Sequence, residues 1–507
     1  MDGHEPTLAR RRTAPIEMDP DAFRAAGHQL VDRLADFLAT LPEQPVSPGA
    51  APAEVRALLS PRPLPAEGED PARLVEESAE LLLRHSLFNG HPRFFGYITS
   101  SAAPIGALGD MLAAAVNPNV GGWPLSPMAS EIEAQTVRWI AELIGYPVEA
   151  GGLLVSGGNA ANLVGFWTGR HAMLGRVRTG DAAADAALPS KLRAYVSAET
   201  HTWIDKAADL SGLGRDAVRW VPTDAELRMD LDALREMMRQ DESDGLRPFL
   251  VVGTAGTVST GAVDPLRALA TLCREKGLWF HVDGAYGAPA AVLPGGPEDL
   301  AALALADSLA VDPHKWLYAP LEAGCAFVRD PGALRDTFTY HPPYYPDEWT
   351  REDAPITYSA YGPQNSRGFR ALKVWLALRQ VGREGYVRMI GDDVALAGAL
   401  RQRVEETPAL EAGPGDLSIC TFRYVPGDLR GDTAAHAVYL DDLNRTVLQR
   451  MQDGGQAYPS HAVVDGRFLL RACIVNFRTD TPDVEALAEL TVRLGREVDA
   501  EMRGAGV

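Results

Sequence analysis

Residues 307–316 read DSLAVDPHKW, a short apolar run followed at once by a turn that contains Lys315. A lysine in this place stands at the end of a β-strand, where its amine is desolvated. Desolvation disfavours the charged form, so we expect a lowered pKa for Lys315 and an amine that condenses readily with an aldehyde cofactor. Taken alone, a lysine beside a histidine is usually surface charge. The motifs around Lys315 favour the reactive interpretation.

The run before Lys315 is one of six short β-rich segments between residues 150 and 330, which alternate with helical stretches. The six segments are GGLLVS, LRAYVS, PFLVVGTAG, LWFHVDGA, DSLAVDP and CAFVRD. Such alternation is typical of an α/β fold, in which helices cover a mainly parallel sheet. Ligands of these folds bind at the carboxyl ends of the strands, so we expect the chemistry there.

HVDGAYG, residues 281–287, places Asp283 at the end of an apolar strand. A carboxylate without a partner is costly to bury, so Asp283 needs a cation nearby. A pyridinium nitrogen is such a cation, and an aspartate partner keeps the ring protonated so that it accepts electrons from a carbanion. An aspartate that caps the following turn is the alternative.

Two further motifs follow strands. SGGNAANL, residues 156–163, joins a strand to a helix through two glycines, and its backbone N–H groups with the helix dipole suit a phosphate. A plain tight turn is the alternative there. His201, in SAETHTW, carries an imidazole that suits stacking on a flat cofactor ring and orienting a substrate carboxylate. A histidine with a purely structural role is the alternative for that motif.

The composition points to small-molecule chemistry. The 507 residues include 68 acidic and 48 basic ones, a formal net charge of −20, so nucleic acid or an anionic membrane would bind against the overall field. The cysteines lack the spacing of a zinc site or a disulfide scaffold, which fits a reducing cytoplasm and predicts no metal. Neither a membrane span nor a secretory signal is evident, so we expect a soluble, cytoplasmic protein.

We predict four segments along the chain. Residues 1–15 form a disordered leader, residues 16–88 a helical arm, residues 89–385 the large cofactor-binding domain, and residues 386–507 a small α+β domain. The small domain is expected to begin with a long amphipathic helix and to end with another, from Asp483 towards Met502, with strand-like SICTFRYV and RFLLRACIVNFR between them.

In their order and spacing, SGGNAANL, SAETHTW, HVDGAYG, DPHKW and the late LLRACIVNFRT resemble the group II pyridoxal-phosphate decarboxylases. The resemblance runs from about Asp21 to the C-terminus. It implies the type I, aminotransferase-like fold of enzymes that depend on pyridoxal 5'-phosphate (PLP), and a carboxy-lyase acting on an amino acid. It also implies that Lys315 carries PLP as a Schiff base, that Asp283 pairs with the pyridine nitrogen and that His201 stacks on the ring. The other implied cofactor neighbours are Gly158, Asn159, Thr257, Ala285, Asp312 and His314, and Ser100 in GYITSS is implied to lie near the substrate.

TFTYHPPYYPDEW, residues 337–349, has the position of a mobile loop of the family. In the family this loop reaches across the dimer, and its tyrosine protonates the carbanion after carbon dioxide leaves. The resemblance assigns that role to Tyr344, with Tyr340 and Tyr345 as competitors. Related aldehyde-forming enzymes carry phenylalanine there, so a tyrosine favours simple decarboxylation. A proline-rich surface loop packed by its tyrosines is the alternative.

The substrate pocket departs from the family pattern. Gly121 and Asn89 stand where aromatic residues are expected, and Ile98 replaces another. The pocket is therefore either wider, suiting an indole, or open to aliphatic side chains. An aromatic amino acid (tyrosine, DOPA, tryptophan or phenylalanine) is the leading substrate class, with an aliphatic or acidic amino acid, aldehyde synthesis and a pseudoenzyme scaffold as alternatives.

Other departures concern the cofactor and the assembly. Val258 occupies the place of a cofactor-facing threonine, and Asp312 replaces an asparagine near the phosphate, which adds a negative charge. Arg370 and Arg471 match family arginines that suit dimer or loop contacts, with structural ion pairs as the alternative. The resemblance further implies a symmetric homodimer with the active site at the subunit interface, and no nucleic-acid or membrane partner.

Overall fold

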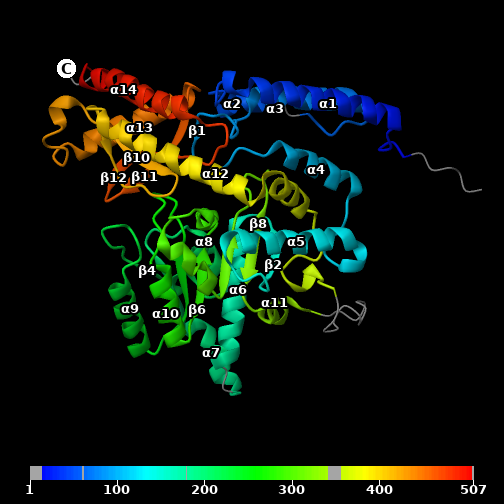
Figure 1. Ribbon diagram of the computed structural model, residues 1–507, viewed down its shortest axis with the longest axis vertical. Helices are drawn as coiled ribbons and strands as arrows, with labels where there is room; N and C mark the ends of the chain where they lie inside the picture. The colour runs from blue at the N-terminus through cyan, green and yellow to red at the C-terminus, as the bar shows by residue number, and fades with distance from the viewer. Residues whose placement is uncertain (1–13, 60–61, 178–179, 341–354, 505–507) are drawn as a thin grey trace, which may run out of the picture.

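The computed structural model describes residues 14–59, 62–177, 180–340 and 355–504, and its largest element is a seven-stranded sheet (Figure 1). β8 is antiparallel to both of its neighbours, and the other six strands are parallel to one another. This confirms the predicted α/β fold with a mainly parallel sheet. In spatial order the strands are β2 (Gly151–Val155), β8 (Gly324–Val328), β7 (Ser308–Val311), β6 (Trp279–Asp283), β5 (Arg247–Thr254), β3 (Leu192–Ser197) and β4 (Val218–Val221).

All six predicted β-rich segments form strands, and the short edge strand β4 was not predicted. Helices cover both faces of the sheet because its strands are apolar on both sides. On β5, for example, Leu250 and Val252 pack into one apolar cluster and Val251 into the other. One face packs against α6 (Gly158–Val177) and α8 (Trp203–Leu210), and the other against α5 (Pro127–Ile144), α9 (Leu231–Ser243) and α10 (Leu266–Lys276).

A second sheet of five strands lies towards the C-terminus, with a third apolar cluster between it and its helices. β1 pairs with β11 in parallel, and the remaining pairs are antiparallel. Its strand order is β1 (Phe94–Phe95), β11 (Tyr458–Val464), β12 (Arg467–Cys473), β10 (Ile419–Tyr424) and β9 (Leu410–Ala412). Its helices are α12 (Ala371–Glu406), α13 (Ala437–Asp453) and α14 (Thr481–Gly504).

Two elements cross the predicted domain bounds. β1 comes from just after residue 89 yet completes the C-terminal sheet, and α12 runs through residue 385. Gly382, with φ of 68°, interrupts the helical geometry of α12 three residues before that bound. The bounds themselves stay a prediction.

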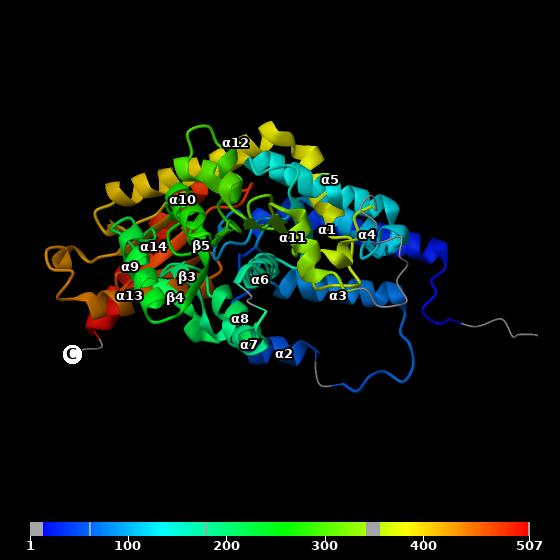
Figure 2. The same ribbon diagram turned by 90° about the horizontal axis from the view of Figure 1, so that it is seen from below.

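The N-terminal helices lie along one side of the molecule, and α1 begins at the opposite end from the last turn of α14 in both views (Figures 1 and 2). The Asp19 side chain accepts the first free N–H groups of α1, and Arg33 of α1 pairs with Glu76 and Glu80 of α3. The elements here are α1 (Pro20–Thr40), α2 (Pro52–Leu59), α3 (Pro71–His85) and α4 (Pro104–Val116).

The remaining helices are short. α6 ends at Val177, and α7 (Ala182–Lys191), which leads into β3, extends beyond the sheet in Figure 1. α11 (Pro331–Phe338) follows β8. Among the described residues, the 3-10 helices are Leu41–Glu43, Trp123–Leu125, Arg215–Ala217, Ala288–Val292, Glu298–Leu305, Tyr358–Ala360 and Gly427–Leu429. In the described parts of the chain, no helix combines the length and apolar character needed to cross a bilayer.

Candidate active site

A cavity of about 300 Å³ opens at the carboxyl ends of the parallel strands, where the fold predicts ligand binding. Most of the predicted site residues line it. They are Gly158 and Asn159 after β2, His201 after β3, Asp283 and Ala285 at the end of β6, and Asp312, His314 and Lys315 after β7. The other lining residues are Ile98, Ser156, Asn162, Thr254, Gly256, Val258 and Tyr286.

Lys315 lies in a tight turn directly after β7, and its Nζ is 3.0 Å from Oδ2 of Asp312. Burial alone would lower the pKa of Lys315, but the negative charges of Asp312 and Asp283 outweigh it and leave the pKa raised. The predicted lowering of this pKa was therefore wrong for the protein without its cofactor. The reason is that two carboxylates face the amine, one of them three residues away on the same turn.

Asp283 is buried at the end of β6, and both of its oxygens are hydrogen-bonded. Oδ2 accepts from the indole Nε1 of Trp203 at 2.8 Å, and Oδ1 accepts from the backbone N–H of Ala285 at 3.2 Å. These bonds fix the plane of the carboxylate towards the cavity. Trp203 stands in the SAETHTW motif, but nothing in the sequence marked it as the partner of a residue 80 positions away.

The start of α6 forms a close-fitting anion seat. Gly157 has φ of 93°, a conformation that favours glycine, and α6 begins at Gly158. A Cβ atom at Gly158 would lie 2.5 Å from Oδ2 of Asp312, so the carboxylate and the first turn of α6 are in direct contact. Oδ1 of Asp312 is buried and has no hydrogen-bond partner among the described residues. Oδ2 pairs with Lys315, so Oδ1 remains as an acceptor for a donor group of a bound ligand.

The two histidines of the site are held by the backbone. His201 lies on the open side of the cavity, and its Nδ1 accepts the N–H of Trp203 at 3.2 Å, which leaves the proton of the neutral ring on Nε2. Partial desolvation lowers the pKa of His201 despite the nearby Asp283. Burial likewise lowers the pKa of His314, whose Nδ1 lies 2.7 Å from the carbonyl oxygen of Ala323.

Ser100 and Thr257 do not line the cavity. The hydroxyl of Ser100 donates to the carbonyl of His314 at 2.9 Å and so braces the lysine turn. The hydroxyl of Thr257 lies 3.1 Å from that of Thr260 and is buried. The neighbouring Val258 faces the cavity instead.

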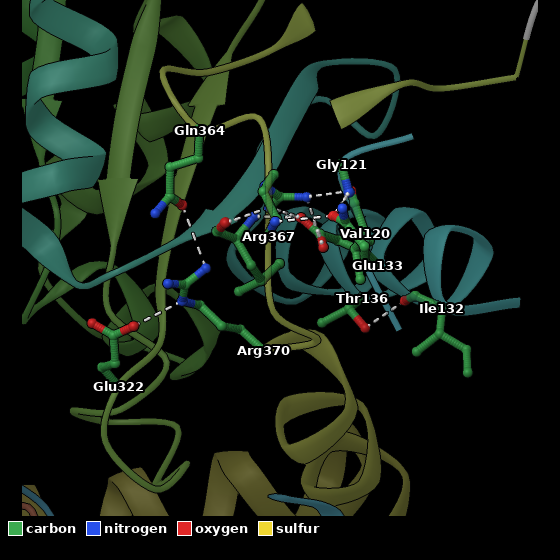
Figure 3. Close-up of polar contacts among 11 residues, drawn as sticks. Val120, Gly121, Ile132, Glu133, Thr136, Glu322, Gln364, Arg367 and Arg370 are labelled. Carbon is green, nitrogen blue, oxygen red and sulfur yellow. Dashed lines mark hydrogen bonds and ion pairs between the residues drawn. The ribbon is translucent and has the colours of Figure 1, made fainter. Parts of the chain in front are cut away.

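Arg471 supports this wall of the cavity from β12. Its guanidinium donates to the carbonyl oxygen of Val258, and its Nε donates to the hydroxyl of Ser460 at 3.0 Å. Arg370 forms contacts within the chain, with Nε donating to Glu322 at 2.8 Å and another nitrogen 3.4 Å from Gln364 (Figure 3).

A buried ion pair ties the segment after residue 355 to the sheet (Figure 3). Arg367 and Glu133 of α5 are both almost completely buried, and Arg367 also donates to the carbonyls of Val120 and Leu154. Leu154 donates its N–H to Glu133 at 2.9 Å. Because Leu154 lies on β2 just before the anion seat, this network fixes one edge of the site.

The positions that were expected to shape the substrate pocket do not all lie at the cavity. Ile98 lines the cavity, whereas Gly121 packs against the chain at Asn365, whose carbonyl oxygen would collide with any Cβ atom there. Tyr340 is 84% exposed, away from the cavity lining. Tyr344 and Tyr345 lie outside the described residues.

Sequence reasoning also missed a buried hydrogen-bond chain under the cavity. Trp279 donates to Ser308 at 2.8 Å, Ser308 lies 2.8 Å from Nδ1 of His281, and Nε2 of His281 lies 2.7 Å from Oδ1 of Asn162, which lines the cavity. Burial lowers the pKa of His281 to about 4, so this ring is neutral at pH 7. Its only sequence signal was a histidine within HVDGAYG.

An amine, a facing carboxylate, a glycine-bounded helix start and an imidazole around one cavity define an enzyme of the PLP-dependent class. Comparison with known proteins agrees. Residues 52–419 match the model of the pyridoxal-dependent decarboxylase conserved domain. An aromatic-L-amino-acid decarboxylase of Bacillus atrophaeus is 31% identical, with 94% of this chain and 97% of that protein covered.

Solved structures are similar over nearly the whole chain. The Oryza sativa TDC with PLP and tryptamine has a TM-score of 0.88 at 28% identity, covering 96% of this chain and 99% of that one. A Catharanthus roseus tryptophan decarboxylase in complex with L-tryptophan has a TM-score of 0.85 at 26% identity, covering 95% and 100%. The chain belongs to the pyridoxal-dependent decarboxylase family, and its cofactor is PLP.

Proposed function

We propose that the protein decarboxylates an aromatic L-amino acid to the corresponding amine and carbon dioxide. The observation that carries the proposal is the opposition of Lys315 and Asp283 across one cavity at neighbouring strand ends. The names of the relatives reported above refer to aromatic amino acids or their amines, and this supports the substrate class. Ile98 and Val258 add apolar surface to the cavity wall, which suits an aromatic side chain.

The residues present fit PLP. Lys315 would hold its aldehyde carbon, Asp283 its pyridine nitrogen, and the first turn of α6 from Gly158 its phosphate. When bound, PLP supplies an aldehyde that takes up amines and a protonated ring that accepts the electron pair released with carbon dioxide. Asp283 is held by two donors, and its carboxylate would keep that ring nitrogen protonated.

The side chains of this protein would then handle protons and orientation. Lys315 would be the amine that holds the cofactor in the resting protein and that the substrate amine would replace. His201, neutral at pH 7 and protonated on Nε2, can donate a hydrogen bond to a substrate carboxylate on the open side of the cavity. We assign to Tyr344 the donation of the proton that replaces the carboxylate, because residues 337–349 resemble the catalytic loop of the family. Ser100 acts indirectly, by bracing the lysine turn.

We also propose that the protein is a homodimer. On α4, Leu108, Met111, Leu112 and Val116 form an apolar stripe that is 47–67% exposed. The opposite side of α4 packs closely on the chain through Gly106 and Gly109. An exposed apolar stripe of this kind marks an interaction surface, and a second copy of this chain would bury it. Leu112→Glu should halve the mass measured by sedimentation equilibrium, and an unchanged mass would remove this surface from the interface.

The cytoplasm is the proposed location. All four cysteines are buried free thiols, which suits a reducing compartment.

The function is tested by incubating the purified, PLP-loaded protein with the common L-amino acids and DOPA while carbon dioxide, amine, aldehyde, ammonia and peroxide are measured. We expect amine and carbon dioxide in equal amounts from an aromatic substrate. Aldehyde with ammonia and peroxide would replace the proposal with aldehyde synthesis, the activity named for a 29% identical Petunia hybrida relative. Amine from an aliphatic or acidic substrate would overturn the aromatic class, and no product at all would favour the pseudoenzyme.

The anchor is tested separately. Borohydride should fix PLP on Lys315, and Lys315→Ala should abolish this label. A label on another lysine would overturn the assignment.

A further inference from the structure

Trp203 contacts two groups of the active site at once. Its indole Nε1 donates to Oδ2 of Asp283 at 2.8 Å, and its backbone N–H donates to Nδ1 of His201 at 3.2 Å. The side chain is 1% exposed and lies at the start of α8, edge-on to His281 with ring centroids 5.6 Å apart. The residue therefore sits beneath the cavity, without lining it.

The bond to Asp283 is the stronger of the two that this carboxylate receives. The other, from the backbone of Ala285, is longer at 3.2 Å. Hydrogen bonds to an ionised group in a buried site count for more than those between neutral groups. A donor on a carboxylate also stabilises its charged form and makes it a weaker base.

We propose that Trp203 is a positioning residue that holds the Asp283 carboxylate in the orientation in which it would meet the ring nitrogen of the cofactor. This inference rests on the proposed function. Without the indole N–H, only the 3.2 Å bond from the backbone of Ala285 would hold the carboxylate, and Asp283 would be less well placed to pair with the ring nitrogen. The bond from the Trp203 backbone to His201 would remain.

The test is Trp203→Phe, with Trp167→Phe as a control. Trp167 of α6 is a partly buried indole that does not line the cavity, and its Nε1 donates to the hydroxyl of Ser211 at 2.9 Å rather than to Asp283. Both variants lose one indole N–H and a similar volume. Any general effect of the substitution on folding therefore shows in both.

For Trp203→Phe we expect kcat to fall by about tenfold to a hundredfold with KM changed by less than about threefold, since the lost bond serves the ring and not the substrate. The dissociation constant for PLP should rise by about tenfold, and the pH at which bound PLP changes its absorbance should shift. Trp167→Phe should leave these three quantities close to the wild type. Equal effects of both variants on kcat and on the PLP spectrum would overturn the proposal.

A double variant separates a failure of this inference from a failure of the proposed function. In an Asp283→Ala background, Trp203→Phe should cause no further loss of PLP affinity, because its partner is gone. Binding of PLP is read from absorbance and needs no turnover. An additive loss would show that Trp203 acts through packing alone.

Discussion

The buried ion pair between Glu133 and Arg367 should be one of the most sensitive points of the fold. The side chains are 0% and 1% exposed, so neither charge has water to replace its partner. Removing one partner from a buried pair costs about 3–5 kcal/mol, because the other charge is left without compensation. We therefore expect Glu133→Gln and Arg367→Met each to lose about this much stability.

The double variant should lose less than the sum of the two. Once both charges are gone, no uncompensated ion is buried, and the remaining cost comes from packing and from the carbonyls of Val120 and Leu154 that lose a donor. Thermal unfolding of the PLP-free protein provides the assay. At about 2 °C for each kcal/mol, each single variant should lower Tm by about 6–10 °C.

An exposed pair provides the control. Arg450 and Glu501 make a hydrogen bond of 2.9 Å, but their side chains are 37% and 59% exposed. Arg450→Met should cost less than about 1 kcal/mol. If Glu133→Gln and Arg367→Met changed Tm no more than this control, or if their effects simply added, the reasoning from burial would be refuted.

Two further predictions concern charges beside the lysine turn. Burial raises the pKa of Asp393 to about 7 even though Trp316 and Tyr318 donate to it, so the stability tied to its protonated form is complete below about pH 4 and lost as the pH rises through 7. At about 1.4 kcal/mol per pH unit this stability amounts to about 4 kcal/mol. Asp393→Asn should therefore become more stable relative to the wild type as the pH rises from 4 to 7, measured by urea unfolding. A difference in stability that stayed constant over this range would contradict the raised pKa of Asp393. Asp312 touches the proposed phosphate seat, so Asp312→Asn should tighten PLP binding by about tenfold in an absorbance titration. The same variant should make the cofactor-free protein less stable, because the ion pair to Lys315 is lost. Weaker PLP binding would show that Asp312 does not face the phosphate.

Local patterns were enough to predict the large sheet and the location of the cavity. Each predicted motif joins an apolar run to a polar turn, and parallel strands bring their carboxyl ends to one edge. Asp283 and Lys315 could therefore be predicted to lie together before any contact was known. The strands β1, β4 and β9 were missed because they have two to four residues and lie at sheet edges, where little periodic signal is present. β11 was also missed, and it contains Pro459, a residue that is depleted in strands.

Electrostatics resisted prediction because they depend on how side chains face one another, and many of these pairs are distant in sequence. The pKa of Lys315 was expected to fall with burial, yet Asp312, three residues before it, and Asp283, 32 residues before it, raise it. The bond from Trp203 to Asp283 spans 80 residues, and the pair of Glu133 with Arg367 spans 234. No local pattern encodes such pairs.

The lysine turn also depends on the C-terminal part of the chain, as its hydrogen bonds and one ring stack show. Asp393 of α12 accepts from Trp316 and Tyr318, Tyr386 of α12 donates to the carbonyl of Leu317, and Tyr286, stacked on Trp316, lies 2.6 Å from the hydroxyl of Ser418 beside β10. The residues after Lys315 are thus held by elements that themselves pack on the second sheet. A change in the packing of α12 would move the amine relative to Asp283, which is fixed from the other side by Trp203. The separation of the two groups is therefore set by both sheets together, and loss of PLP affinity should accompany substitutions in α12 that never contact the cavity.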